Sequence, residues 1–475
     1  MKNKISYFII LSLMACQALL VSCGNRNPNL SEKQLQELMN DSIQKVAAIL
    51  SDTGYVPPAG ARHTEIRSVD LADPPAIIDI AGNLENKKEF KLSDFASSVR
   101  YIYLQQPPDT KSTSISDVAS DDKHIFVNTS EGLFCYSDEG QYLYTVCVNE
   151  LETSSLGARV VRGIYGNIDL LNGSLMYRSL HWPSLDEGIT DMQLNVCDVN
   201  ELDARMLFNI QSRELKNSNL QPKYQRRVDP KNSAGTTRFL LMDDLSLFNS
   251  NSLTGVAIYG DTLCQFNDYD QPTTIVRVSV RPQIYRMDGH VMLRQGYNDT
   301  VFRVMPPNRL TPAYVMQWGE YKPDINQYAA GSDLEEKLVL QEWIETPRHI
   351  FIEYTEGRSY PARWRQGKVK FHWAIYDKTA KTLTHHLVSP IPAMREANVG
   401  TMTSPVPLPA MFENDIEPVG MPFWPKGVNH KDEMYMTFSR EQIKSYIATG
   451  KFQNDKLQAI FDNMPDDGFY LMMVK

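Results

Sequence analysis

The sequence lacks the short motifs that assign a catalytic mechanism. It holds no GxSxG nucleophile elbow, no HExxH zinc-binding pair, no P-loop and no dinucleotide-binding glycine fingerprint. The neighbouring histidines His385 and His386 would point to opposite faces of a strand, so they cannot hold one metal ion together. His372 lies in an apolar run, where a hydrogen-bonded core histidine is the expected role. These absences lean away from an enzyme without deciding the question.

Cysteine is scarce, and basic charge is not in excess. The six cysteines include no CxxC pair, which argues against a zinc site. We expect buried free thiols, with a disulfide as the alternative, at Cys135, Cys147, Cys197 and Cys264. The 48 Lys and Arg against 57 Asp and Glu give a net charge of -9, which argues against nucleic acid as a partner. No cofactor is predicted, and a structural cation is the one alternative.

The N-terminus has the architecture of an export signal. Two lysines precede an almost wholly apolar run over residues 5–21, which is typical of a secretory signal. The run ends at Leu-Val-Ser-Cys, which resembles the bacterial lipobox. We therefore predict a removable signal over residues 1–22 and lipidation of Cys23, which would hold the protein at a membrane. An ordinary signal peptide and an uncleaved anchor are the alternatives.

A tether is predicted between the signal and the strands. Ser31 and Gln34 form a capping box, and apolar residues recur at helical spacing as far as Gly54, which predicts one helix. Residues 53–76 are rich in Pro, Gly and Arg and are predicted to be a linker. The expected domains are therefore a lipidated tether, helix and linker over residues 23–90 and one β domain over 91–475.

From about residue 98 the chain reads as short strands joined by polar turns. Strands at 115–119, 124–127, 133–136 and 142–146 would form one four-stranded antiparallel sheet, as in a propeller blade. Five similar groups follow, with strands predicted at 162–165, 175–177 and 193–197; at 256–259, 262–264 and 275–278; at 284–287, 291–293, 300–304 and 313–316; at 350–354, 371–376 and 382–387; and at 434–437 and 469–474. Short helices are predicted at 332–343, 439–448 and 454–461.

Three stretches of the sequence resemble a known family. KLSDFASSVRYIYL (residues 91–104) resembles the opening of the six-bladed β-propeller lipoproteins of Bacteroides relatives. NDTVFRV (298–304) with TPAYVMQWG (311–319) resembles their mid-chain strand pair, and residues 115–146 fit their first blade. The resemblance implies an all-β, six-bladed propeller with short helical insertions, closed by pairing of the first and last strands. It carries over no catalytic residues.

The resemblance also bears on location. Lipoproteins of that group that reach the cell surface often carry acidic residues just after the lipidated cysteine, whereas Gly-Asn-Arg-Asn follows Cys23. We therefore expect a lipid-anchored envelope protein in the outer membrane, facing the periplasm rather than the outside. One departure is the polar stretch 149–157, where such proteins often have a Gly-Pro-rich loop.

Aromatic and arginine-rich loops supply the candidate ligand-binding residues. Trp182 and Trp424 lie beside prolines in predicted loops, where indole rings can stack on sugars, with loop packing as the alternative. Arg363, Trp364 and Arg365 belong to an unusual cluster over residues 358–365. Its guanidinium groups could bind an acidic sugar or carboxylate, with a solvated hairpin tip as the alternative.

Three functions fit these features. The favoured one is a binding module in the envelope that holds a glycan or a partner protein. The second is a polysaccharide hydrolase or lyase, which predicts titratable groups converging at the central channel. The third is a partner of an outer-membrane transport complex, which predicts a broad apolar patch.

Overall fold

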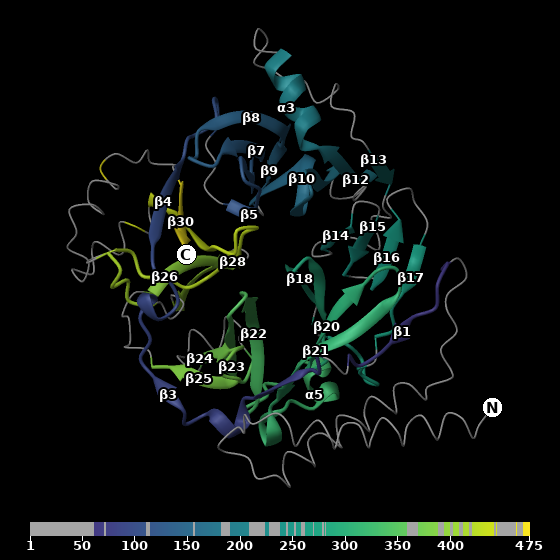
Figure 1. Cartoon of the computed structure of the whole chain (residues 1–475), viewed down its shortest axis with the longest axis vertical. Helices are drawn as coiled ribbons and strands as arrows, with labels where there is room; N and C mark the ends of the chain where they lie inside the picture. The colour runs from purple at the N-terminus through teal and green to yellow at the C-terminus, as the bar shows by residue number, and fades with distance from the viewer. Residues whose placement is uncertain are drawn as a thin grey trace. The chain divides into compact units, whose positions relative to one another are not determined.

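Six sheets are arranged around a ring in the part of the chain that the computed structural model describes (Figure 1). The described residues are 61–70, 73–110, 115–154, 157–181, 191–208, 224–227, 238–243, 246–250, 253–257, 262–268, 270–277, 280, 282–358, 369–387, 394–399, 402–407, 412–417, 420–440, 443, 462 and 469–475. Consecutive strands pair antiparallel within each sheet, so the fold is the expected six-bladed β-propeller.

The first three blades follow one another along the chain. Blade 1 contains β5 (Ile115–Ser120), β6 (His124–Thr129), β7 (Gly132–Ser137) and β8 (Tyr142–Val148). Blade 2 contains β9 (Glu150–Ser154), β10 (Gly157–Leu171), β11 (Ser174–His181), β12 (Asp191–Asp198) and β13 (Tyr224–Arg227), with helix α3 (Val199–Phe208) after β12. Blade 3 contains β14 (Phe239–Asp243), β15 (Ser246–Asn249), β16 (Thr254–Ala257) and β17 (Thr262–Gln265).

The other three blades complete the ring. Blade 4 contains β18 (Gln283–Met287), β19 (His290–Arg294), β20 (Thr300–Met305) and β21 (Arg309–Gln317), followed by η3 (Gly319–Tyr321) and α5 (Ile325–Ala330). Blade 5 contains β22 (Leu338–Glu345), β23 (His349–Glu356), β24 (Lys370–Asp377) and β25 (Thr382–His386). Blade 6 contains β28 (Gly427–Val428), β29 (Met434–Ser439), β30 (Phe469–Val474) and β4 (Val99–Leu104). A separate hairpin pairs β26 (Met394–Val399) with β27 (Met402–Pro407).

Blade 6 closes the ring with strands from both ends of the propeller sequence. Strand β4 pairs antiparallel with β30, and Ile102 lies opposite Leu471. This confirms the predicted pairing of the early strand with the terminal one. Closure of this kind leaves no open sheet edge between the first and last blades.

A belt, defined as the described residues from Arg62 to Phe90, covers the outer edges of three blades. Its first backbone groups bond to β17 of blade 3, with Arg62 N donating to Thr262 O over 3.1 Å. Strands β1 (Ile66–Arg67) and β2 (Ala76–Asp79) then pair parallel with β21, and β3 (Lys87–Lys88) pairs parallel with β25. The propeller unit therefore begins before the boundary predicted at residue 91, and part of the expected linker is sheet.

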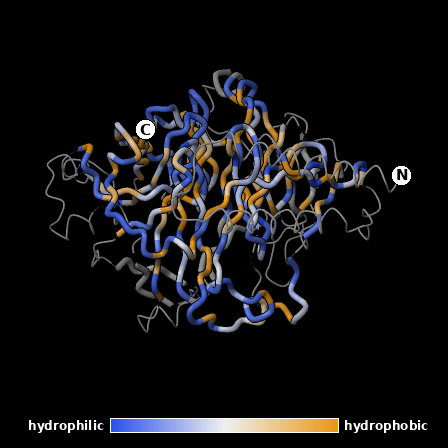
Figure 2. Tube along the Cα trace, turned by 60° about the horizontal axis from the view of Figure 1, so that its bottom comes forward, coloured by the Kyte–Doolittle hydropathy of each residue, from blue (hydrophilic) through white to orange (hydrophobic). Residues whose placement is uncertain are grey.

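Among the described residues, the core consists of six apolar clusters, and each of them lies at a seam between two neighbouring blades. The alternation of side chains along a strand explains this arrangement. In β6, Ile125 and Val127 pack against blade 6, whereas Phe126 between them packs against blade 2. Because both faces of a blade are buried, strands such as β7 are apolar at consecutive positions, from Leu133 to Tyr136. Figure 2 colours the chain by hydropathy and shows orange, apolar segments among the blades.

Two predictions for individual segments were wrong. The helix expected at 332–343 is instead a turn followed by β22, because Leu334 and Glu336 have positive φ angles that no helix accommodates. The strand expected at 275–278 is irregular over its described residues, and Ile275 is 79% exposed. Two of the four strands of blade 3, β14 and β15, were not predicted. The helices predicted at 439–448 and 454–461 lie almost wholly outside the described residues.

Candidate functional site

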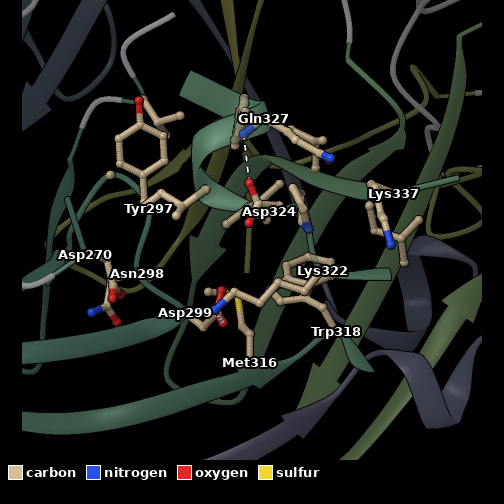
Figure 3. Close-up of a pocket in the computed structure, with 18 of the residues that line it drawn as sticks. Asp270, Tyr297, Asn298, Asp299, Met316, Trp318, Lys322, Asp324, Gln327 and Lys337 are labelled. Atoms are coloured by element: carbon tan, nitrogen blue, oxygen red, sulfur yellow. Dashed lines mark hydrogen bonds and ion pairs between the residues drawn. The ribbon is translucent and has the colours of Figure 1, made fainter. Parts of the chain in front are cut away.

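A pocket of about 630 Å³ lies between blades 4 and 5. Its walls come from the chain that leads into blade 4, the β19–β20 connection, the segment from the end of β21 through α5, and the start of β22. The residues that line it are Asp270, Val280, Arg294, Gly296, Tyr297, Asn298, Asp299, Met316, Trp318, Lys322, Pro323, Asp324, Ile325, Gln327, Tyr328, Lys337, Leu338, Val339 and Leu340. Figure 3 shows ten of these residues labelled around the cavity.

Arg294 ends β19 and is buried, with 8% of its surface exposed. Its Nε donates to Gln283 Oε1 over 3.1 Å, and its Nη1 donates to the carbonyl of Gly296 over 3.4 Å. Both acceptors are neutral. Burial lowers the pKa of this guanidinium from its ordinary value, because the charged form loses hydration. The cation is therefore held in the pocket wall by neutral groups.

Aromatic side chains form another part of the lining. The rings of Tyr297 and Tyr328 meet edge to face with centroids 5.8 Å apart. Burial raises the pKa of Tyr328 further above its ordinary value. Arg358, directly after β23, lies 4.9 Å from the centre of the Tyr328 ring and donates to the backbone carbonyls of Tyr328 and Ser332. Rings held in this way offer a surface on which an apolar face of a ligand can rest.

Most acidic groups of the pocket already have partners. Asp299 Oδ2 forms an ion pair with Lys322 Nζ over 2.5 Å, and the two side chains lie next to each other in Figure 3. Asp324 caps α5 by accepting a hydrogen bond from Gln327 N over 2.9 Å. Lys337 donates to the backbone carbonyl of Glu320 and has no ion pair within the described residues. Asp299 is thus part of the polar wall of the pocket.

The candidate residues singled out from the sequence are not in this pocket. Trp424 is completely buried and packs against Phe351 and Phe412, so it belongs to the blade 5–blade 6 core and offers no stacking face. This corrects its prediction as a ligand-binding loop residue, because the Phe–Trp–Pro segment here packs into the core. The other candidates lie outside the described residues: Cys23, Trp182, Arg363, Trp364 and Arg365.

The blade 5 histidines behave as the strand argument predicted. His385 Nε2 meets Tyr354 Oη over 2.5 Å, whereas His386 Nδ1 accepts from Phe90 N over 3.2 Å, so the two side chains have separate partners. His372 stacks on Tyr354 and bonds to Glu356 over 3.0 Å at the edge of the core. Within the described residues no group of three or more His, Cys, Asp or Glu side chains could hold a metal ion. None of the four internal cysteines forms a disulfide, and three of them are buried as predicted, whereas Cys147 is half-buried.

Carboxylates on the innermost strands join neighbouring blades. Asp117 of β5 accepts from Ile168 N of β10 over 3.0 Å. Asp169 of β10 accepts from Leu241 N of β14 over 2.7 Å and from Arg286 Nη2 of β18 over 2.6 Å. Burial raises the pKa of Asp117 to about 6. Both carboxylates accept hydrogen bonds from backbone N–H groups of the next blade, so they stabilise the contact between blades.

A histidine also connects helix α3 to blade 1. His124 Nδ1 lies 3.0 Å from Asp121 Oδ1, and its Nε2 lies 3.0 Å from Asp203 Oδ2 on α3. Asp203 also accepts from the Tyr144 hydroxyl over 2.9 Å. The hydrogen bond that His124 donates to Asp121 and the charges of both carboxylates raise the pKa of His124, against the opposing effect of burial.

Replacing His124 by glutamine is expected to give a stability loss that depends on pH. Because the pKa of His124 is raised in the folded state, protonated His124 contributes its full stabilisation below pH 6.5. This contribution to the free energy of unfolding is lost as pH rises through the raised pKa. The loss in unfolding free energy should therefore be larger at pH 6 than at pH 9. Urea unfolding across this range measures it, and His430→Gln, at an exposed ion pair with Asp122, is the control. A pH-independent loss for His124→Gln would contradict the charged pairing.

The described residues thus define a β-propeller with a ligand-sized pocket at a blade seam, and comparison with known proteins places the chain in a family. The chain belongs to the family described as Domain of unknown function (DUF4933), whose model matches residues 58–449. Together with the fold, this membership confirms the resemblance to uncharacterised propellers of Bacteroides relatives. The chain matches no curated protein.

Solved structures of similar fold include proteins of Bacteroides. One from Bacteroides fragilis, titled as an exported protein, is 10% identical with a TM-score of 0.47, over 84% of this chain and 99% of that one. One of unknown function from Bacteroides thetaiotaomicron is 9% identical with a TM-score of 0.31, over 84% of this chain and 75% of that one. A glutaminyl cyclase of Myxococcus xanthus is 13% identical with a TM-score of 0.26, over 60% of this chain and 94% of that one. These likenesses assign no activity.

No helix in the described part of the chain is long and apolar enough to cross a membrane.

Proposed function

We propose that this protein is a lipid-anchored binding module of the bacterial cell envelope, and that it holds a glycan in the pocket between blades 4 and 5. The pocket itself carries the proposal. Its volume of about 630 Å³ lies within the range of small-ligand sites, roughly 300–1,000 Å³. Tyrosine rings, amides and carboxylates line it together, and this combination suits a sugar, which has apolar ring faces and polar hydroxyl edges.

The anchor and the location come from the N-terminal sequence. Cleavage before Cys23 and lipidation of that residue would attach the protein to the envelope, in our proposal to the outer membrane on its periplasmic side. A polysaccharide hydrolase or lyase at the central channel is the alternative. It has less support, because Asp117 and Asp169 accept hydrogen bonds from backbone groups of the next blade.

Substitutions in the pocket are expected to weaken glycan binding. The full-length chain, purified in detergent, is tested on an array of neutral and uronate-containing oligosaccharides. Tyr297→Ala and Asn298→Ala each remove a lining side chain and should weaken binding by about tenfold or more, the effect of about 1.4 kcal/mol. His290→Ala, at the opposite end of β19, is the matched control and should bind normally. Equal binding by all three variants, or no binding by the wild type, would reject this site.

A further inference from the structure

We infer that the pocket selects ligands carrying a single carboxylate, and that Arg294 is the residue that recognises it. This inference deepens the proposed function and depends on it. Arg294 forms no ion pair in the described part of the chain, although more than nine-tenths of its surface is buried. Its hydrogen bonds go only to Gln283 and to the carbonyl of Gly296.

A buried cation without a counter-ion is unusual, because desolvation of charge is costly and proteins normally offset it with an opposite charge. Asp299 acts on Arg294 electrostatically, but its carboxylate lies 2.5 Å from Lys322 Nζ. Arg294 lines the pocket, so a ligand there could supply the missing negative charge. The planar guanidinium matches the geometry of a carboxylate and can bind it through two parallel hydrogen bonds.

The remaining lining argues for one negative charge and several hydroxyl groups on the ligand. Asp299 and Asp324 face the same cavity and would repel a second anionic group. Their carboxylate oxygens, and the amide of Asn298, can instead accept hydrogen bonds from hydroxyl groups. Tyr297 and Tyr328 provide ring surface nearby. A sugar acid of the uronate type combines these properties.

The sequence had pointed to the same chemistry at a different place. The predicted arginine cluster begins at Arg358, whose guanidinium lies over the ring of Tyr328. Tyr328 lines the pocket, so Arg358 positions a wall of the site. Arg294 carried no signal in the sequence, because it is a lone charge at the end of an apolar strand.

The experiment compares sodium D-glucuronate with glucose plus sodium chloride at equal concentrations, by calorimetric titration of the full-length chain in detergent. Wild-type protein should bind glucuronate at least ten times more tightly than glucose. Arg294→Gln should lose this preference, because glutamine keeps hydrogen-bonding groups but no charge. Arg294→Lys keeps the charge and most of the volume but lacks the planar guanidinium, so its preference for glucuronate over glucose should be reduced. This variant serves as the test if Arg294→Gln fails to fold.

A second readout separates recognition from a structural role. Without ligand, Arg294→Gln should melt no lower than the wild type, because the uncompensated charge is gone; a lower melting temperature would overturn the inference. Equal binding of both sugars by wild type and variant would overturn it and leave the proposed function intact. If the wild type binds no glucuronate but still binds an arrayed neutral oligosaccharide, the inference alone fails. If neither binds, both fail.

Discussion

Ile102→Asp is expected to abolish cooperative folding of the propeller at neutral pH. Ile102 is 3% exposed and lies in the apolar cluster that joins blade 6 to blade 1. A carboxylate there would lose its hydration without gaining a partner, and changes of this kind cost about 4 kcal/mol or more. Because native domains have stabilities of about 5–15 kcal/mol, little folded protein should remain.

The position matters because β4 is held from two sides. On one side β4 pairs with β30, the last strand of the chain. On the other side, Gln105 N donates to Gly140 O in the β7–β8 turn of blade 1 over 2.9 Å. Gly140 has a φ of 86°, and a Cβ atom there would collide with the carbonyl of Tyr103. A disturbance at Ile102 therefore opens the ring at its closing seam.

Urea unfolding followed by tryptophan fluorescence measures this loss. Arg100→Asp, two residues earlier on the same strand, is the matched control, because the Arg100 side chain is 45% exposed. Its pair with Glu433 spans 3.4 Å at the surface and should be worth no more than about 1 kcal/mol. An Ile102→Asp variant with a wild-type unfolding midpoint would show that β4 is not needed to close the ring.

The second large effect is a loss of stability in acid that depends on His386. Burial lowers the pKa of His386 from 6.5 to about 4. Below pH 6.5 the unfolded chain takes up a proton that the folded protein refuses, so stability falls as pH falls from 6.5 towards 4. Each pKa unit corresponds to about 1.36 kcal/mol, so His386 alone should remove about 3 kcal/mol over this range.

A hydrogen bond adds to burial in resisting protonation of His386. His386 Nδ1 accepts from Phe90 N, and a proton on this nitrogen would place two donors against each other. His385 differs, because its Nδ1 donates to the carbonyl of Asn83 over 2.9 Å, while its Nε2 faces the Tyr354 hydroxyl. Burial likewise lowers the pKa of His385 to about 4. Both histidines hold the belt against blade 5.

His386→Gln should remove this acid sensitivity, since an amide oxygen can still accept from Phe90 N but does not titrate. The free energy of unfolding of wild type and variant is compared in urea at pH 7.5, 6, 5 and 4.5. Between pH 7.5 and pH 4.5 the free energy of unfolding of the wild type should fall by about 3 kcal/mol more than that of the variant. The reason is that only the wild type has a buried His386 that must stay unprotonated in the folded state. His63→Gln, at an exposed belt position, is the control. Parallel pH profiles for wild type and His386→Gln would refute the mechanism.

Much of the fold could be predicted because local pattern and topology agree in it. The four strands of blade 1 are separated by tight polar turns such as the one at Gly140, and each was predicted within a few residues. Strand β22 was missed because acidic residues around Glu335 mimic a helix start, whereas its pairing with β23 depends on residues distant in the sequence. The belt was missed because its parallel pairs with β21 join segments more than 200 residues apart.

The candidate site was much less accessible from the sequence. Its lining comes from segments that the β-strands bring to one seam, and neither Arg294 nor Tyr328 belongs to a motif. The residues that stood out in the sequence were aromatic neighbours of proline, and Trp424 shows that such a pattern can equally mark core packing. That Arg294 has no counter-ion among the described residues can be seen only from the distances around its side chain.

The belt also determines how the propeller would respond to a pulling force. Tension that enters from the N-terminal side first reaches the bonds from Arg62 and His63 to β17, then the pairs of β1 and β2 with β21, and then β3 on β25. Only afterwards does it load β4, the strand that closes the ring. These contacts would break one after another, so the belt would detach before the force reaches the closing strand β4.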